Sequence, residues 1–232
     1  ARKVFFIGIG GIGISALAQM MHSHGAKVSG VNDEEGETTK LLQNLGIEII
    51  PRGTLGIVPE ADLYVYSDAW IYRGPEIIEV AKKTGKPVMS YFEALGEISK
   101  NYKVIAISGT HGKTTTTAMV AGMLEDAGLD PTVIVGSFVK KFKSNFKAGR
   151  SEYLVVEADE YNRHMLYFHP FIGVVTNVEE DHLDCYRDLA DIEEAFAKFI
   201  AQSEHKVTDY EKYLAQVPVL AVPGEHNRKN AA

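Results

Sequence analysis

A glycine loop with a lysine and a run of threonines stands near the middle of the chain. Its sequence is GTHGKTTTT (109–117), between a strand-like apolar run and a helix-like segment. In such a loop Gly112 avoids a side-chain clash, Lys113 neutralises phosphate charge, and the Thr114 hydroxyl can reach Mg²⁺. The usual G-x-x-x-x-G-K-[ST] spacing is absent because position 107 is Ile. The sequence therefore predicts a compact form of the loop that binds nucleotide phosphates.

Acidic and histidine side chains follow two further strand-like runs. EADE (157–160) ends one apolar run, and TNVEEDHLD (176–184) follows another. Ligands of α/β sheets bind at the carboxyl ends of the strands. We therefore expect Glu157 or Asp159 to supply the hard oxygen ligand that Mg²⁺ prefers. His182 alone would be interpreted as structural, but beside these two motifs we interpret it as a metal or phosphate contact.

Another glycine motif stands near the start of the sequence and is the first of the two in chain order. GIGGIG (8–13) satisfies G-x-G-x-x-G through Gly8, Gly10 and Gly13, and it stands between a strand-like run and a helical pattern. The acidic Asp33 lies 20 residues after Gly13. These features alone favour a dinucleotide such as NAD. Two alternatives stay open: the glycines could serve packing only, and Asp33 could belong to a solvated acidic loop.

The elements that must position these motifs alternate along the chain. Apolar runs predict strands, helical spacing of apolar residues predicts helices, and their alternation predicts parallel, doubly wound sheets of the α/β class. Hydrophobic patterning restarts near residue 101, which predicts two domains at 1–101 and 102–232. The predicted strands are 4–9, 26–31, 47–50, 61–67, 86–91, 103–109, 132–138, 153–159 and 171–178, and the predicted helices are 14–25, 38–46, 75–85, 110–128 and 189–202. The last residues, HNRKNAA, resemble the beginning of a helix.

Composition narrows the class of protein. The chain has 232 residues, 45% of them hydrophobic, and a net charge of −7 without a basic stripe, so a dedicated nucleic-acid binder is not expected. The lone Cys185 excludes a disulfide framework and a cysteine-based zinc cluster. No apolar run reaches the roughly 18 residues of a membrane span and no signal peptide is visible. We expect a soluble, cytoplasmic protein.

Five motifs, taken together and in this order, resemble the Mur ligases, the ATP-dependent amide-forming enzymes of peptidoglycan synthesis. The resemblance covers nearly the whole chain except about 203–217. The resembling segments are GIGGIGISALA (8–18), SGTHGKTTTTAM (108–119), VEADEYNRHML (156–166), TNVEEDHLDCY (176–186) and PGEHNRKNAA (223–232). The chain departs from the family pattern at VNDEE (31–35), where a Ser-Asp is usual, and at Asn162 and His164, where Asp and Ser are more common.

The resemblance implies a role for each motif. The first domain is expected to be Rossmann-like and to bind the UDP of a sugar substrate instead of NAD. The second is expected to be an incomplete P-loop central domain that binds ATP. The implied UDP-sugar contacts are Gly8, Gly10, Gly11, Gly13 and Asp33; the implied ATP contacts are Gly109, Thr110, His111, Gly112, Lys113, Thr114, Thr115, Asn227 and Asn230; the implied Mg²⁺ contacts are Thr114, Glu157 and His182; and the implied catalytic residues are Lys113 and His182.

Within the family, the resemblance implies the reaction that joins L-alanine to the muramoyl carboxylate of UDP-N-acetylmuramate through an acyl phosphate. The expected partners are these two substrates, with neither nucleic acid nor membrane. The resemblance also leads us to expect that the sequence lacks the family's third domain and part of the central domain before Val217, so that the chain alone would be nearly inactive. Three alternatives stay open: the related murein tripeptide ligase of cell-wall recycling, an NAD-dependent oxidoreductase, and a non-catalytic nucleotide-binding module.

Overall fold

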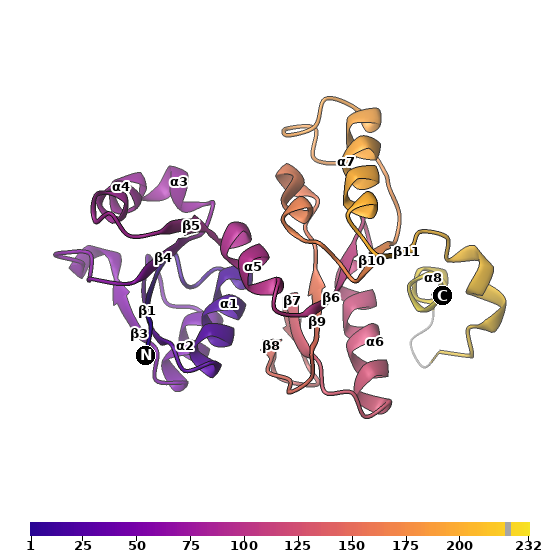
Figure 1. Cartoon of the computed structure of the whole chain (residues 1–232), viewed down its shortest axis with the longest axis horizontal. Helices are drawn as coiled ribbons and strands as arrows, with labels where there is room; N and C mark the ends of the chain where they lie inside the picture. Colours follow the sequence, from indigo (N-terminus) through magenta and orange to yellow (C-terminus); the bar gives the residue numbers. More distant parts are fainter. Residues whose placement is uncertain (221–223) are drawn as a thin grey trace. The chain divides into compact units, whose positions relative to one another are not determined.

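The computed structural model describes residues 1–220 and 224–232, which form two compact α/β units (Figure 1). One unit consists of Ala1–Leu95 with Gly136–Ala148, and the other of Gly96–Val135 with Gly149–Ala232. The grouping of 136–148 with the first unit differs from the sequence expectation, which placed this segment in the second domain. Its physical reason is a set of buried polar contacts with a helix of the first unit, described below. Pro223, the first residue of the segment 223–232, lies outside the described residues.

The first unit contains a five-stranded parallel sheet in the order β3-β2-β1-β4-β5. The central strand β1 is buried because its apolar run faces packed layers on both sides; Phe5 and Ile7 are fully buried. Strand bounds are β1 Lys3–Ile7, β2 Lys27–Asn32, β3 Glu48–Pro51, β4 Leu63–Tyr66 and β5 Val88–Ser90. Helix bounds are α1 Ile12–Ser23, α2 Glu37–Asn44, α3 Trp70–Arg73, α4 Pro75–Lys83 and α5 Tyr91–Ser99, with a 3₁₀ turn at Arg52–Thr54.

The second sheet has the order β11-β10-β6-β9-β7-β8. Strand β6 pairs in parallel with β9 and β10, and α6 packs against β6 and β9. Strand bounds are β6 Lys103–Ser108, β7 Thr132–Val139, β8 Ser144–Lys147, β9 Tyr153–Glu157, β10 Ile172–Val175 and β11 His205–Val207. Helix bounds are α6 Lys113–Asp126, α7 Leu189–Ala201 and α8 Glu225–Ala231, with 3₁₀ turns at Tyr161–Tyr167 and Glu211–Gln216.

The structure confirms the α/β class, the parallel pairing, and every predicted strand and helix to within a few residues. The helix expected over 110–128 begins only at Lys113, because residues 109–112 form the glycine loop. Helix α8 confirms the helix expected at HNRKNAA. Within the described part of the chain, the α-helices and strands that were not predicted are α3, α5, β8 and β11, and the three 3₁₀ turns were not predicted either. Among the described residues, no helix is both long and apolar enough to cross a membrane.

Candidate nucleotide-binding sites

The second glycine loop connects the end of β6 to the start of α6 and requires glycine at two positions. Gly109 and Gly112 have φ angles of +135° and +85°, which L side chains rarely adopt. A Cβ atom on Gly109 would lie 2.0 Å from the Thr176 hydroxyl oxygen, and one on Gly112 would lie 2.4 Å from Oδ1 of Asn230. The loop backbone is therefore closely approached by β10's end and by α8.

Residues that follow β10 fix the shape of this loop. Asn177 accepts hydrogen bonds from two loop amides: its carbonyl from Thr110 N–H at 3.1 Å and its Oδ1 from His111 N–H at 2.9 Å. The backbone N–H of Glu179 donates to the Thr110 hydroxyl at 2.9 Å. In α6 the first intrahelical bond is Thr116 N–H to the Gly112 carbonyl. The amides just before Thr116 are consequently the ones available to an anion at the helix start.

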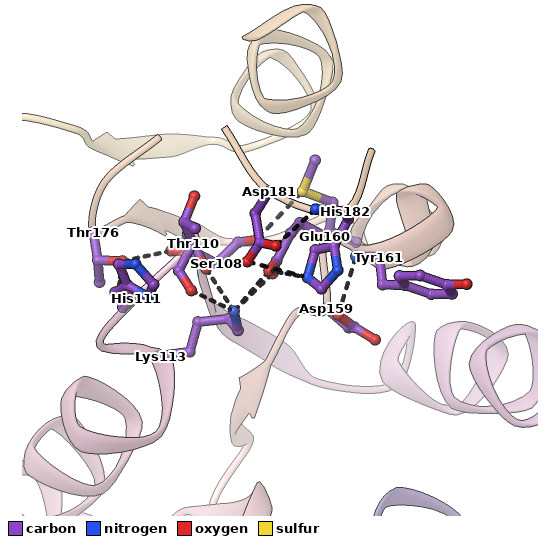
Figure 2. A network of polar contacts seen from close by, with 12 residues as sticks. Ser108, Thr110, His111, Lys113, Asp159, Glu160, Tyr161, Thr176, Asp181 and His182 are labelled. Carbon is purple, nitrogen blue, oxygen red and sulfur yellow. Dashed lines mark hydrogen bonds and ion pairs between the residues drawn. The ribbon is translucent and has the colours of Figure 1, made fainter. Parts of the chain in front are cut away.

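Lys113 points from this loop toward a buried carboxylate (Figure 2). Its ammonium group donates to the Gly109 carbonyl at 2.6 Å, to the Thr110 carbonyl at 3.2 Å, and to Oε1 of Glu160 at 2.9 Å. Glu160 is only 3% exposed, and its Oε1 also lies 3.3 Å from Nε2 of His182. The two predicted catalytic residues, Lys113 and His182, thus meet on one carboxylate.

Glu160 is the last residue of the EADE motif, and its sequence position alone did not predict a role for it. Its position follows from the end of β9, which lies beside β6 with Ile107 paired to Glu157. Three residues after Glu157, the chain turns back over the glycine loop. The signal that could have identified Glu160 is the repeat of carboxylates at a strand end that neighbours a lysine loop.

His182 is held in a strained backbone conformation beside an aromatic ring. Its φ angle is +54°, and its backbone N–H is 2.7 Å from Oδ1 of Asp181. The ring of Tyr161 meets that of His182 edge-on with centroids 5.3 Å apart, while the Tyr161 hydroxyl donates to Asp184 at 2.9 Å. A non-glycine residue keeps a left-handed conformation only where its surroundings fix it. In this conformation the imidazole of His182 lies beside Tyr161 and contacts Glu160.

The turn that follows Glu160 is also strained, and Arg163 in this turn contacts two other residues. Asn162 and Arg163 have φ angles of +49° and +60°. The Arg163 guanidinium lies 2.8 Å from Oδ1 of Asp191 and 5.1 Å from the centre of the Tyr186 ring. Hydrogen bonds from Arg187 lower the pKa of Asp191 to about 2, and burial raises the pKa of Tyr186 to about 12. Asp191 is therefore the anion that anchors this turn.

The three predicted magnesium contacts come from three different segments of the second unit. Thr114 lies in the first turn of α6 and Glu157 ends the neighbouring strand β9, whereas His182 contacts Glu160. Within residues 1–220 and 224–232, no three His, Cys, Asp or Glu side chains are grouped as a protein-only metal site requires. A hydroxyl and carboxylates at adjacent strand ends nevertheless suit Mg²⁺, which is commonly held by one or two carboxylates together with substrate phosphates.

A cavity of about 480 Å³ lies beside the lysine loop. Four of the predicted ATP contacts line it, and so does His226 of the same terminal motif. Asn227 is buried in α8 and is not part of the lining. The predicted residues in the lining are His111, Gly112, Thr115 and Asn230; those not predicted as ATP contacts are Thr176, Asn177, Glu179, Tyr210 and Lys229. Tyr210 comes from the stretch that the sequence motifs do not cover.

A second cavity, of about 400 Å³, lies at the first glycine motif. Four of the predicted UDP-sugar contacts, Gly8, Gly10, Gly11 and Asp33, line it, whereas Gly13 faces the ring of Tyr91. Asp33 forms an ion pair with Arg52 at 3.4 Å. Neighbouring side chains shape the loop: Oδ1 of Asn32 accepts from Gly10 N–H at 3.1 Å, and the Thr38 hydroxyl donates to the Gly10 carbonyl at 2.5 Å. Asn32, Thr38, Ser67, Trp70 and Arg73 also line this cavity and were not predicted.

Two family models match the chain in succession. The Mur ligase family, catalytic domain, matches residues 3–103, and the Mur ligase middle domain matches residues 107–216. The UDP-N-acetylmuramate–L-alanine ligase of Caldicellulosiruptor saccharolyticus is 44% identical over 199 residues, which are 85% of this chain and 44% of that protein. The chain therefore spans less than half the length of this curated relative.

Two solved ligase structures are also similar to this chain. UDP-N-acetylmuramate–alanine ligase MurC from Thermotoga maritima is 34% identical, with a TM-score of 0.80 over 91% of this chain and 50% of that one. UDP-N-acetylmuramate:L-alanyl-gamma-D-glutamyl-meso-diaminopimelate ligase from Neisseria meningitides is 26% identical, with a TM-score of 0.84 over 99% of this chain and 90% of that one. Together with the two glycine loops and the lysine at the second, these matches show that the chain belongs to the Mur ligase family.

Proposed function

We propose that this chain provides the substrate-binding and ATP-binding domains of an ATP-dependent ligase that joins L-alanine to UDP-N-acetylmuramate in peptidoglycan biosynthesis. The observation that carries the proposal is the meeting of Lys113 and His182 on the buried Glu160, beside a cavity lined by the glycine loop. The 44%-identical relative is a UDP-N-acetylmuramate–L-alanine ligase, which supports L-alanine as the amino acid. Residues 1–101 would bind the UDP-sugar and residues 102–232 would bind ATP.

Each cavity fits one of the two nucleotides. The cavity at Gly8, Gly10 and Gly11 would take the UDP of the sugar, with the amides at the start of α1 facing its phosphates. The cavity at His111, Gly112 and Thr115 would take ATP, with the triphosphate on the loop and the base toward Tyr210, His226 and Asn230.

The reaction needs cationic groups because both reactants are anions. A muramoyl carboxylate oxygen attacks the γ-phosphorus of ATP, the bond from that phosphorus to the β–γ bridging oxygen breaks, and ADP leaves. The alanine amine then attacks the carbonyl carbon of the acyl phosphate, the carbon–oxygen bond to phosphate breaks, and the nitrogen loses a proton. Lys113 would offset charge on the transferring phosphoryl group. Glu160 would keep the Lys113 ammonium group at the loop, and His182 would be positioned by the same carboxylate.

Mg²⁺ fits the same edge of the sheet. Thr114, Glu157 and Glu160 offer the oxygen donors that this ion prefers, and His182 lies beside Glu160. When bound, the ion would neutralise phosphate charge and polarise the phosphoryl oxygens.

Calorimetric titration of this chain tests the assignment of the two sites. We expect UDP-N-acetylmuramate and Mg²⁺–ATP each to bind at one site, and NAD not to bind. Binding of NAD in place of the UDP-sugar would indicate an oxidoreductase and overturn the proposal.

Phosphate release tests the choice of amino acid. In a chain extended to the length of the curated relatives, we expect release that requires ATP, UDP-N-acetylmuramate and L-alanine together. Release with the tripeptide L-alanyl-γ-D-glutamyl-meso-diaminopimelate but not with L-alanine would assign the chain to the tripeptide-ligating activity instead. No release with either acceptor would indicate a non-catalytic module.

A further inference from the structure

A buried polar network joins the segment 136–148 to α1, the helix that follows the first glycine loop. The network contains Ser15 and Gln19 from α1 and Ser144 and Asn145 from β8, and all four side chains are buried. Both segments belong to the first compact unit, although about 125 residues separate them in the sequence. Buried polar groups are costly unless each is hydrogen-bonded, so a network of four needs matching geometry on both sides.

Asn145 is the centre of this network and has no exposed surface. Its Oδ1 accepts a hydrogen bond from Nε2 of Gln19 at 2.9 Å. Its Nδ2 donates to the Ser15 hydroxyl oxygen at 2.9 Å and to the carbonyl oxygen of Ile12. The amide therefore uses both its acceptor and its donor groups on a single helix.

The contact with Ile12 reaches the glycine loop itself. Ile12 is the first residue of α1 and lies within the GIGGIG motif. The first intrahelical bond of α1 is Ser15 N–H to the Gly11 carbonyl at 2.9 Å, so the amides before Ser15 are those that can face an anion. The Ser15 hydroxyl also donates to the Ile12 carbonyl at 2.9 Å. Asn145 and Ser15 thus hold the same carbonyl in the turn that presents these amides.

We infer that Asn145 is a positioning residue for the UDP-sugar site: from a distant part of the sequence, it fixes the first turn of α1. The inference rests on the proposed function, because it concerns the ligand of the first glycine loop. Such a loop must hold its amides to within about half an ångström of the productive geometry. An apolar side chain at position 145 could fill the same space, but it could not fix the orientation of the Ile12 carbonyl.

The chain offers a matched control for the test. Ser144 is the neighbouring residue of β8, is also buried, and donates to Oε1 of Gln19 at 3.0 Å. Among the described residues, the Ser144 hydroxyl forms hydrogen bonds with Gln19, Asn145 and Phe146 and not with Ile12. Ser144→Ala therefore disturbs the network without removing the bond to the glycine loop.

Calorimetric titration with UDP-N-acetylmuramate separates these roles. We expect Asn145→Ala to raise the Kd by about tenfold or more, and Ser144→Ala to change it less than about twofold. Asn145→Leu fills a similar volume but cannot donate a hydrogen bond to the Ile12 carbonyl. We expect it to weaken binding as Asn145→Ala does, whereas a role in packing alone would leave the affinity near that of the wild type. The Kd for Mg²⁺–ATP should stay within about twofold in all three variants.

A measurement on the unmodified chain covers the case in which the variants do not fold. Because coupling between two sites is reciprocal, UDP-N-acetylmuramate should slow amide hydrogen exchange in residues 144–147. Unchanged exchange there, or unchanged UDP-sugar affinity in folded Asn145 variants, would overturn the inference while leaving the proposed function intact. If the unmodified chain does not bind the UDP-sugar at all, the proposed function fails first, and the inference falls with it.

Discussion

The ammonium group of Lys113 lies 2.8 Å from Oε2 of Glu160, a carboxylate that also contacts His182. The lysine that the sequence assigns to phosphate is thus already paired with an internal anion. A triphosphate bound in the loop would share or replace this partner. Because Glu160 is buried, it would become an uncompensated charge if Lys113 moved away, unless His182 or a metal ion took over. The side chains of the three residues therefore form one connected polar cluster.

Replacing Lys113 tests its role in charge neutralisation. Lys113→Ala should lower the turnover of an enzyme of full family length by about 10³-fold or more, because phosphoryl transfer depends on cationic stabilisation. Phosphate release under saturating substrates is the measurement. UDP-N-acetylmuramate should bind the variant as it binds the wild type. Retention of more than a tenth of the wild-type activity would contradict the assignment.

A double-mutant cycle measures the link between Lys113 and Glu160. Glu160→Ala removes the carboxylate from a pair that is 21% and 4% exposed, so we expect it to lower the free energy of unfolding by about 2 kcal/mol. In the double variant with Lys113→Ala, the losses should be smaller than their sum by about 1–3 kcal/mol. Urea denaturation of the four proteins gives the coupling. If the two losses in unfolding free energy were strictly additive, the contact between Lys113 and Glu160 would contribute nothing to stability.

Two glycines of the α6 region, Gly112 just before the helix and Gly122 inside it, allow a test of the loop conformation with a matched control. Gly112→Ala forces a left-handed conformation on alanine and places its Cβ 2.4 Å from Oδ1 of Asn230. We expect the Kd for Mg²⁺–ATP to rise by about tenfold, equivalent to roughly 1.4 kcal/mol of strain or displacement. Gly122 lies inside the helix with no neighbour within 4 Å of an added Cβ. Gly122→Ala should leave ATP binding unchanged and stabilise the helix by up to about 1 kcal/mol.

The lowered pKa of Asp191 predicts that the free energy of unfolding decreases at low pH. Its pKa of about 2 lies below the roughly 3.9 of an unfolded aspartate, so the folded state binds fewer protons between these values. The stabilisation from Asp191 is therefore complete above about pH 4 and is lost as the pH falls toward 2. In denaturation measured against pH, Asp191→Asn should be less stable than wild type at pH 5, and the difference should narrow below pH 4. A constant difference would contradict this account, and Glu193→Gln on the exposed face of α7 serves as control.

Local patterns predicted most of the fold. Buried parallel strands such as β1 and β9 are mostly apolar runs, and the glycine loops mark where a strand ends and a helix begins. These elements can therefore be predicted from the sequence. Helix α5 was not predicted, although the residues at its start form a recognisable helix-start signal. Ser90 and Glu93 form a capping box, in which Glu93 Oε2 accepts from Ser90 N–H at 2.7 Å and the Ser90 hydroxyl accepts from Glu93 N–H at 3.2 Å.

The elements and contacts that were missed depend on tertiary structure. Strand β8 begins with Ser144 and Asn145, whose polar side chains suggest a loop until their buried partners on α1 are known. For the site, residue types and spacing nominated the glycine loop, and the motifs around His182 nominated that residue; both stay predictions. The pairing of Lys113 with Glu160 was not predicted, because it depends on how the turn after β9 folds back over the loop.

A crystal structure of this chain with Mg²⁺ and a non-hydrolysable ATP analogue tests most directly whether the glycine loop and Lys113 bind the triphosphate. We predict that the phosphates lie on the loop at 109–115 with the γ-phosphate within hydrogen-bonding distance of the Lys113 ammonium group, and that the base occupies the cavity lined by Tyr210, His226 and Asn230. An analogue bound elsewhere, with Lys113 still paired to Glu160 and the loop without phosphate, would contradict the account.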